Sequence, residues 1–176
     1  YKIVPADSLI SSSTYDFAKN ENYPSELQPR DRDRVSMREQ VDDMARNLSP
    51  QDLAESRNVN EGAPVINQDN VVENGNGRTM AITRAYKHGG EAYNASAKAY
   101  KRFLVDNAEK FGYTKEQVEA MENPVLVRQR NASSDNLQDS IIHSTNGGMK
   151  MSSSQQAQAD VKKLTAKTLA KYNYDG

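Results

Sequence analysis

The 176-residue chain contains no cysteine and only two histidines. Without cysteine it can form no disulfide, no thiolate nucleophile and no cysteine zinc site, and two histidines are too few for a histidine-rich metal centre. No apolar run approaches the roughly 18 residues that a membrane span requires. The 23 basic residues are balanced by 24 acidic ones, whereas a dedicated DNA-binding domain usually has a basic excess. Any contact with nucleic acid is therefore expected at a local patch.

The composition is that of one soluble domain, or of one domain with an appendage. Hydrophobic residues make up 36% of the chain, charged residues 27%, and the mean hydropathy is −0.89, which predicts a modest core. The chain opens inside a predicted strand and lacks an initiating Met, so we expect it to be a piece of a longer protein. The lack of cysteine suits a cytoplasmic protein, and no membrane partner is expected.

The first third of the chain predicts one strand, one long loop and one helix. A short strand is expected within residues 1–10. The polar stretch 11–33 is too long for a simple connector and predicts a functional or wrapping loop. Ser36 and Glu39 form a capping-box pattern that predicts the start of a helix. Apolar residues at steps of three and four predict one buried face on that helix: Met37, Val41, Met44, Ala45 and Leu48.

The following residues predict a short helix and then a mixture of strands and helices. Ser49 and Pro50 are typical of a helix start. Gly112 is expected to end the longest helix, and Thr114 with Gln117 to open the next one through a capping box. The further expected elements are a hairpin at 63–73, helices at 78–88 and 91–111, a strand at 124–127, and helices at 135–144 and 153–172.

The strongest chemical signal is the passage from a predicted strand through two glycines into a helix, between Glu73 and Met80. Glycine permits a close backbone approach, and the first amides of a helix are unpaired, point outward and favour an anion. Arg78 adds a permanently charged fork suited to phosphate. The alternative is a plain turn that needs positive φ. The residues that would hold a phosphate or nucleotide are Asn74, Gly75, Asn76, Gly77, Arg78 and Thr79.

A second basic signal alternates arginine with aspartate just before the first predicted helix. Strand-like alternation would place Arg30, Arg32 and Arg34 on one face and the aspartates on the other. Such a row of arginines could grip phosphate groups. The alternative is a solvated loop whose charges pair with one another.

Together these motifs resemble the ParB-like domain of DdrB-type proteins, a branch of the ParB/sulfiredoxin superfamily found in phage and plasmid polyvalent or antirestriction proteins. The resemblance rests on four segments in this order: YKIVPADSLI, YPSELQPRDRDR, GAPVINQDNVVENGNGRTMAITRAY and MSSSQQAQADVKKL. It implies an α+β fold with a small mixed sheet, surrounding helices and a helix-rich C-terminal part. We expect a ParB-like domain at residues 1–130 and a helical extension at 131–176, packed on that domain or on a neighbour.

The resemblance also implies a nucleotide ligand. In the superfamily, a glycine-and-basic turn at a helix start holds nucleotide phosphates, and members include a CTP-binding DNA clamp, a serine kinase, nucleases and a peroxiredoxin-repair enzyme. Gly75 is similar to the leading glycine of that turn and Arg78 to its final basic residue. Asn76 stands where the repair enzyme has cysteine, so this chain cannot perform that reaction. The clamp's acidic residue and two arginines are replaced by Asn76, Gly77 and a single Arg78, and no helix-turn-helix pattern follows.

The expected function is binding of a nucleotide or of nucleic-acid phosphate in the DNA transactions of a mobile element, in antirestriction or in a partition-like role. NTPase or phosphotransferase activity is a candidate. The expected ligand is CTP, ATP or ADP with Mg²⁺, and the expected partners are DNA and other domains of a larger protein. The alternatives are a non-catalytic module that binds DNA, RNA or protein, and a metal-dependent nuclease.

Charge and proximity in the sequence suggest further roles at this expected site. Glu73 and Asp69 are candidates for orienting phosphate-bound Mg²⁺, and Glu39 is the candidate general base, because a carboxylate is the available base near the turn. The row formed by Arg30, Arg32 and Arg34 would supply a second positive contact to the ligand.

Overall fold

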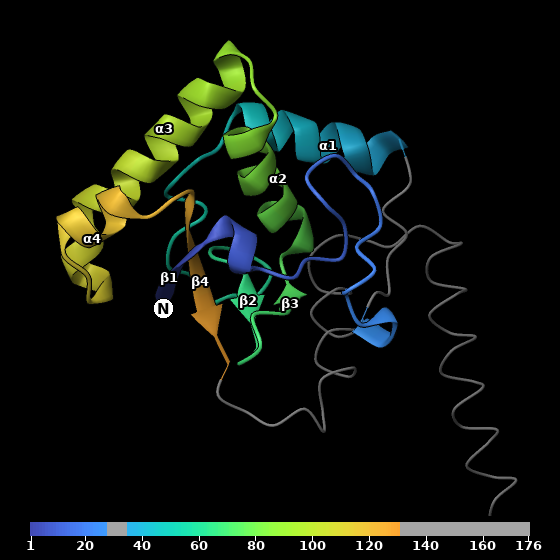
Figure 1. Cartoon of the computed structure of the whole chain (residues 1–176), viewed down its shortest axis with the longest axis horizontal. Coiled ribbons are helices and arrows are strands. Elements are labelled where there is room, and N and C mark those ends of the chain that lie inside the picture. The colour runs from blue at the N-terminus through green and yellow to red at the C-terminus, as the bar shows by residue number, and fades with distance from the viewer. Residues whose placement is uncertain (28–34, 131–176) are drawn as a thin grey trace, which may run out of the picture.

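The computed structural model describes residues 1–27 and 35–130, which form an α+β fold, as expected (Figure 1). The strands and α-helices are β1 (Lys2–Pro5), α1 (Val35–Arg46), β2 (Val65–Ile66), β3 (Val72–Asn74), α2 (Asn76–Lys87), α3 (Glu91–Asp106), α4 (Lys115–Ala120) and β4 (Pro124–Gln129). Three short 3-10 helices lie at Ala6–Ser8, Ser25–Leu27 and Ala108–Phe111. The helices expected at 135–144 and 153–172 fall outside the described residues.

The strands form one small mixed sheet in the order β1-β4-β2-β3. β4 pairs antiparallel with β1 and parallel with β2, and β2 pairs antiparallel with β3. β4 lies between two neighbours and carries the apolar run from Pro124 to Val127, which is entirely buried. β3 is an edge strand, and its far end leads directly into α2.

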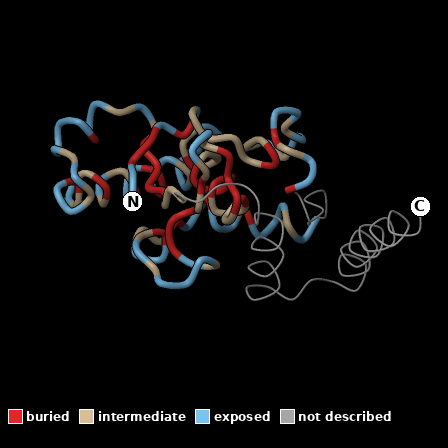
Figure 2. The backbone as a smooth tube through the Cα atoms, turned by 90° about the horizontal axis from the view of Figure 1, so that it is seen from below, coloured by how far each residue is buried: buried red, intermediate tan, exposed pale blue. Residues whose placement is uncertain are grey.

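The helices α1, α2 and α3 contact one another, and α2 and α3 also contact the sheet (Figure 1). α2 is the most enclosed of them, because Met80, Ala81 and Ile82 are each at most 1% exposed. The buried segments meet in the middle of the described part of the molecule, and the exposed ones form its periphery (Figure 2). The phenol of Tyr100 reaches from α3 to the sheet and accepts a hydrogen bond of 3.0 Å from the Leu126 amide.

A polar junction fixes the three helices to one another. The Asp42 carboxylate on α1 accepts 2.6 Å hydrogen bonds from Arg84 Nε on α2 and from the Tyr93 hydroxyl on α3. Partial burial opposes ionisation of Asp42, but the hydrogen bonds from Tyr93 and Arg84 outweigh it, so its pKa lies below the ordinary value. The Arg84 guanidinium also lies over the Phe17 ring, at 4.8 Å, and so ties the N-terminal loop to the helices.

The described part of the long N-terminal loop wraps around the free edge of β3, which agrees with the predicted wrapping loop. Ile10 forms a parallel bridge with Val71, and the Val72 amide donates to the Ile10 carbonyl at 2.9 Å. Tyr23 and Leu27 then pack with Val71 in a second hydrophobic cluster, separate from the main core. The loop thus covers a sheet edge that would otherwise leave backbone groups unpaired.

Several predicted boundaries in the first half of the chain are wrong. α1 begins at Val35, so Ser36 lies inside its first turn instead of capping it. Met44 is 36% exposed although it was expected in the buried face. Residues 49–53 form hydrogen-bonded turns in place of the predicted short helix. A single turn does not repay the cost of helix nucleation, and burial of Leu53 fixes this segment instead.

Predictions for the second half are closer to the structure. The hairpin of β2 and β3 is confirmed, and α2 begins at Asn76, two residues before the expected start. The predicted helix over 91–111 divides into α3 and a 3-10 turn, which Gly112 ends in a left-handed conformation. The capping box of Thr114 and Gln117 is confirmed at the start of α4. Among the described residues, no helix is long and apolar enough to cross a membrane.

Candidate functional site

The passage from β3 into α2 depends on Gly75. This residue has φ 87° and ψ 27°, a left-handed conformation that glycine adopts without steric cost. A Cβ atom at position 75 would lie 2.9 Å from Nη2 of Arg78, so the guanidinium occupies the space that a side chain would need. The Gly75 carbonyl accepts hydrogen bonds from the amide and the hydroxyl of Thr79, at 2.8 Å and 3.1 Å. The first turn of α2 is therefore anchored to this glycine.

The first amides of α2 remain available. Within the part of the chain that the structure describes, no acceptor is recorded for the backbone N–H groups of Asn76, Gly77 and Arg78. These N–H groups are the ones that a helix cannot satisfy internally, and they lie at the positive end of the helix dipole. Gly75 caps the helix without any side-chain acceptor. Donors of this kind at the positive end of a helix can bind an anion.

The side chain of Asn76 has a structural task that the sequence did not reveal. Its Oδ1 accepts a 2.8 Å hydrogen bond from the Ser12 amide, and its Nδ2 donates to the Tyr23 hydroxyl at 3.1 Å and to the Val72 carbonyl at 3.3 Å. The Tyr23 hydroxyl in turn donates to the Val72 carbonyl at 2.7 Å. Asn76 is only 8% exposed, so this network holds the N-terminal loop against the beginning of α2.

The Arg78 side chain turns away from the helix axis toward residues 56–63, which we call the carbonyl loop. Its guanidinium donates to the Gly62 carbonyl at 2.5 Å, to the Val59 carbonyl at 3.2 Å and to Asn74 Oδ1 at 2.9 Å. Arg78 thus joins the end of β3, the start of α2 and the carbonyl loop. The predicted contact of Arg78 with phosphate stays a prediction, but most of its hydrogen-bonding capacity is used within the protein.

Sequence reasoning missed a second arginine that holds the same loop. The Arg128 guanidinium on β4 donates to four carbonyls of the carbonyl loop, at distances between 2.8 Å and 3.3 Å. These carbonyls belong to Ser56, Asn58, Glu61 and Ala63. The available signal was an arginine directly after a buried apolar run, where a charged side chain needs local partners.

Burial and charge lower the pKa of Arg78. Loss of hydration is the main cause, the nearby Arg128 charge adds to it, and the Glu61 carboxylate opposes it, which leaves the pKa at about 10. Arg78 therefore remains cationic at neutral pH. Among the described residues neither Arg78 nor Arg128 has a carboxylate within ion-pair distance, so their positive charges are met by neutral carbonyl groups.

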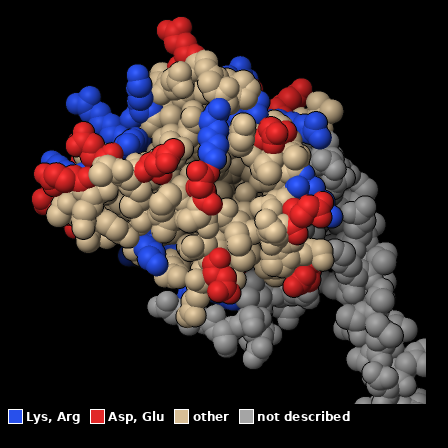
Figure 3. Space-filling view, viewed as in Figure 1, with Lys and Arg blue, Asp and Glu red and all other residues tan. Residues whose placement is uncertain are grey.

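Arg78 also lines an open cleft of about 570 Å³ beside the carbonyl loop. The lining also contains the partly exposed Met44 and three acidic residues, Asp52, Glu55 and Glu61. Acidic and basic side chains are interspersed over the face of the molecule shown in Figure 3, and no single basic patch dominates the described residues there. Acidic residues thus outnumber basic ones in the cleft lining, whereas the start of α2 presents backbone N–H groups.

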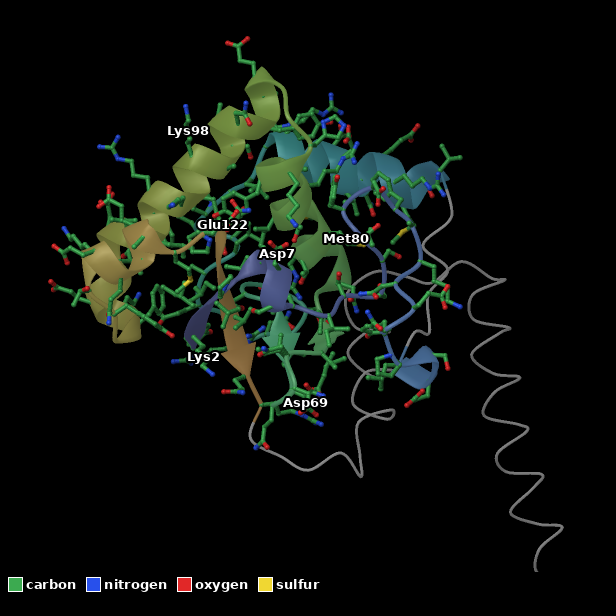
Figure 4. All side chains as sticks on the ribbon, viewed as in Figure 1. Lys2, Asp7, Asp69, Met80, Lys98 and Glu122 are labelled. Atoms are coloured by element: carbon green, nitrogen blue, oxygen red, sulfur yellow. The ribbon has the colours of Figure 1, made fainter. Side chains whose placement is uncertain are left out.

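The structure separates the two carboxylates proposed to orient Mg²⁺. Asp69 is exposed in the turn between β2 and β3 (Figure 4), at the end of β3 that lies away from Gly75. Glu73 is 5% exposed, and its Oε2 lies 3.0 Å from Nε of Arg130. Burial raises the pKa of Glu73, and the charge of Arg130 opposes that rise. In the described ranges no three histidine or acidic side chains are arranged to hold a metal ion.

The other predicted site residues lie apart from the turn or outside the described residues. Glu39 is exposed on the first half of α1; its role as a base stays a prediction. Arg30, Arg32 and Arg34 lie between residues 28 and 34, outside the described residues. Of the predicted site residues that the structure describes, Asn74, Gly75, Asn76, Gly77, Arg78 and Thr79 lie together at the passage from β3 into α2.

The fold and the turn define an α+β domain in which a buried helix starts from an edge strand through a left-handed glycine. A family profile described as the ddrB-like ParB superfamily domain matches residues 1–131. The chain belongs to this family. Comparisons with curated proteins and with solved structures gave no match.

Proposed function

We propose that this ddrB-like ParB domain binds the phosphate groups of a nucleotide at the start of α2, and that it acts in the DNA transactions of a mobile element. One observation carries the proposal: three consecutive amides, from Asn76 to Arg78, have no acceptor among the described residues behind the left-handed Gly75. The conformation is already formed without a ligand, so binding would cost little ordering of the backbone. Membership of the family supports the same assignment.

The ligand chemistry follows from the donors. Backbone amides and a helix dipole bind phosphate oxygens through charge-assisted hydrogen bonds, without a requirement for a particular base. CTP, ATP and ADP with Mg²⁺ are the nucleotides to test, because the Mg²⁺ ion would arrive on the phosphates. The balance of 23 basic and 24 acidic residues favours a small phosphate ligand over a nucleic-acid backbone, which requires a basic surface.

Calorimetry on the full 176-residue chain tests the proposal directly. The informative variant is Gly77→Asp, because a carboxylate in the first helical turn favours the helix dipole but repels a bound phosphate. We expect nucleotide affinity to fall more than tenfold while thermal stability stays equal or rises slightly. The matched control is Ala92→Asp, which places the same charge in the exposed first turn of α3 and should leave binding unchanged.

Two results would overturn the proposal. The first is absence of heat and of thermal stabilisation with CTP, ATP and ADP, each with Mg²⁺. The second is equal loss of affinity in Gly77→Asp and Ala92→Asp, since general charge repulsion would then explain the effect. Binding of DNA or RNA that needs no nucleotide and weakens steeply with salt would indicate instead that the site binds a nucleic-acid backbone. Phosphate release by wild type and by Glu39→Gln then measures hydrolysis separately from binding.

A further inference from the structure

One buried hydroxyl group beside the start of α2 has no hydrogen-bond partner. Ser12 is 1% exposed, and its Oγ atom is buried without a donor or acceptor. Buried hydroxyls in native proteins almost always have a partner, so an exception requires a physical explanation. No sequence pattern distinguishes this serine from its neighbours.

The position of Ser12 follows from the wrapping of the N-terminal loop along β3. The bridge between Ile10 and Val71 aligns this segment parallel to β3, so that the residues after Ile10 advance toward the beginning of α2. There the Ser12 amide donates to Asn76 Oδ1 at 2.8 Å. The Ser12 hydroxyl is joined to that amide through two carbon atoms, which keeps it beside the first residue of the helix.

The same segment is held by further hydrogen bonds that restrict movement of Ser12. The Asn20 amide donates to the Ser12 carbonyl at 3.2 Å, and Asn20 Nδ2 donates to the Ser11 carbonyl at 2.9 Å. The Ser11 hydroxyl donates to the Ser13 carbonyl at 2.8 Å. Each of these neighbouring polar groups thus has a hydrogen-bond partner, whereas the Ser12 hydroxyl has none.

Other unpaired buried atoms have a simpler explanation. Glu73 Oε1 and the Nε and Nη2 atoms of Arg130 also have no hydrogen-bond partner, but all three belong to one carboxylate–guanidinium pair whose Nε and Oε2 atoms are 3.0 Å apart. Such pairs readily become bidentate, so these atoms can satisfy each other. Within residues 1–27 and 35–130, no comparable unpaired group is recorded next to Ser12.

From this placement we infer that the Ser12 hydroxyl is a side-chain donor to the anion bound by the first amides of α2. The inference rests on the function proposed above and extends it, because it adds a residue from the N-terminal loop to a site otherwise built from backbone groups. Asn76 links the two parts, since its side chain holds the Ser12 amide while its own amide is one of the free donors. Binding would give the unpaired hydroxyl its acceptor.

The test compares ligand affinity and stability in the full chain. The probes are inorganic tripolyphosphate and Mg²⁺-bound CTP, ATP and ADP, and the variants are Ser12→Ala and Ser12→Thr. We expect Ser12→Ala to bind about tenfold more weakly, which corresponds to one lost hydrogen bond to a charged ligand. Ser12→Thr keeps the hydroxyl and should stay within about twofold of wild type. Ser36→Ala, at an exposed position on α1, is the matched control and should bind as wild type does.

Stability without ligand distinguishes a ligand contact from a structural contact. Removal of an unpaired buried hydroxyl should leave the melting temperature of Ser12→Ala unchanged or raised, whereas removal of a structural hydrogen bond should lower it. Equal affinity of Ser12→Ala and wild type would overturn this inference and leave the proposed function intact. Absence of binding by wild type would overturn both. A weakened Ser12→Ala with an equally weakened Ser12→Thr would show that packing, and not the hydroxyl, is responsible.

Discussion

The start of α2 contains Arg78, and the carbonyl loop accepts hydrogen bonds from it. The two regions differ in whether their polar groups have hydrogen-bond partners. In the carbonyl loop, two guanidinium groups and the backbone carbonyls satisfy one another through six hydrogen bonds. At the start of α2, three amides and the Ser12 hydroxyl have no partner among the described residues. A saturated region is typical of a structural element, and an unsaturated one at a helix end is typical of a binding site.

The comparison changes the interpretation of the glycine-rich motif. Sequence reasoning treated Arg78 as the charged end of a phosphate site, but the guanidinium belongs mainly to the saturated region. Gly75 serves both regions, because its conformation starts the helix and its missing side chain gives room to the guanidinium. The motif therefore combines a structural clamp with a donor site. The following predictions test this division, from the largest expected effect to the smallest.

Gly75→Ala should have the largest effect, because it disturbs both regions. An alanine would have to adopt φ 87° and would displace the Arg78 guanidinium from a position 2.9 Å from its Cβ. We expect a loss of about 3 kcal/mol in the free energy of unfolding, from backbone strain and lost hydrogen bonds. Urea denaturation measures it. Gly89→Ala is the control, with φ 77° but open space around the Cβ, and should cost about 1 kcal/mol; equal losses would refute the role of the guanidinium.

Asn76→Ala should have the next largest effect, because it disconnects the N-terminal loop from α2. The Ser12 amide would lose its acceptor, and Tyr23 would lose a partner, in a site that is 8% exposed. We expect a loss of about 2 kcal/mol in the free energy of unfolding, together with faster amide hydrogen exchange in residues 10–13. Exchange rates in β1 and β4 should remain those of wild type. A uniform increase throughout the domain would contradict a local role.

Arg128→Lys should weaken the carbonyl loop with little effect on the start of α2. Lysine keeps the charge but cannot reach four carbonyls with one ammonium group. We expect a loss of about 1–2 kcal/mol in the free energy of unfolding and faster proteolysis within residues 56–63. Arg102→Lys, at an exposed position on α3, is the control. Unchanged nucleotide affinity in Arg128→Lys would support a purely structural role for the carbonyl loop. A loss of nucleotide affinity as large as that of Gly77→Asp would contradict it.

Glu73→Gln should have the smallest effect, and it should depend on pH. Burial raises the pKa of Glu73 above its unfolded value, so the folded state binds this proton more tightly than the unfolded state does. The carboxyl therefore contributes most stability below the unfolded pKa, and loses that contribution as the pH rises through the folded pKa. The stability of wild type relative to Glu73→Gln should fall over this interval. Glu119→Gln, exposed on α4, should show no such trend; a rising difference would contradict the direction of the shift.

The local sequence predicted much of the fold because several elements carry their own signals. The Thr114–Gln117 capping box, the Gly112 termination and the apolar run of β4 all form as expected. Signals that depend on a single turn were unreliable: Ser36 does not cap α1, and Ser49 with Pro50 starts no helix. Helix caps compete with tertiary contacts of similar free energy, so neighbouring segments decide the outcome.

The candidate site, like the fold, has features that the local sequence predicted and features that it did not. Gly75, its helix start and the free amides could be predicted from the motif, because they depend on backbone properties of a few consecutive residues. The carbonyl-loop partners of Arg78, the role of Arg128 and the position of Ser12 could not be predicted. Each depends on contacts between residues that are 16 to 72 positions apart in the chain. A single sequence does not show which distant residues come into contact.

The sequence by itself determined the family through the order of its motifs, and the family implied the α+β class. It also determined the helix start after Gly75, which follows from local backbone preferences. Only the tertiary structure decided which polar groups would find partners. A charged side chain such as Arg78 can pair with a ligand or with the protein, and in this fold the carbonyl loop and Asn74 accept its hydrogen bonds. The same packing left the Ser12 hydroxyl and the first amides of α2 unpaired, because no described acceptor reaches them.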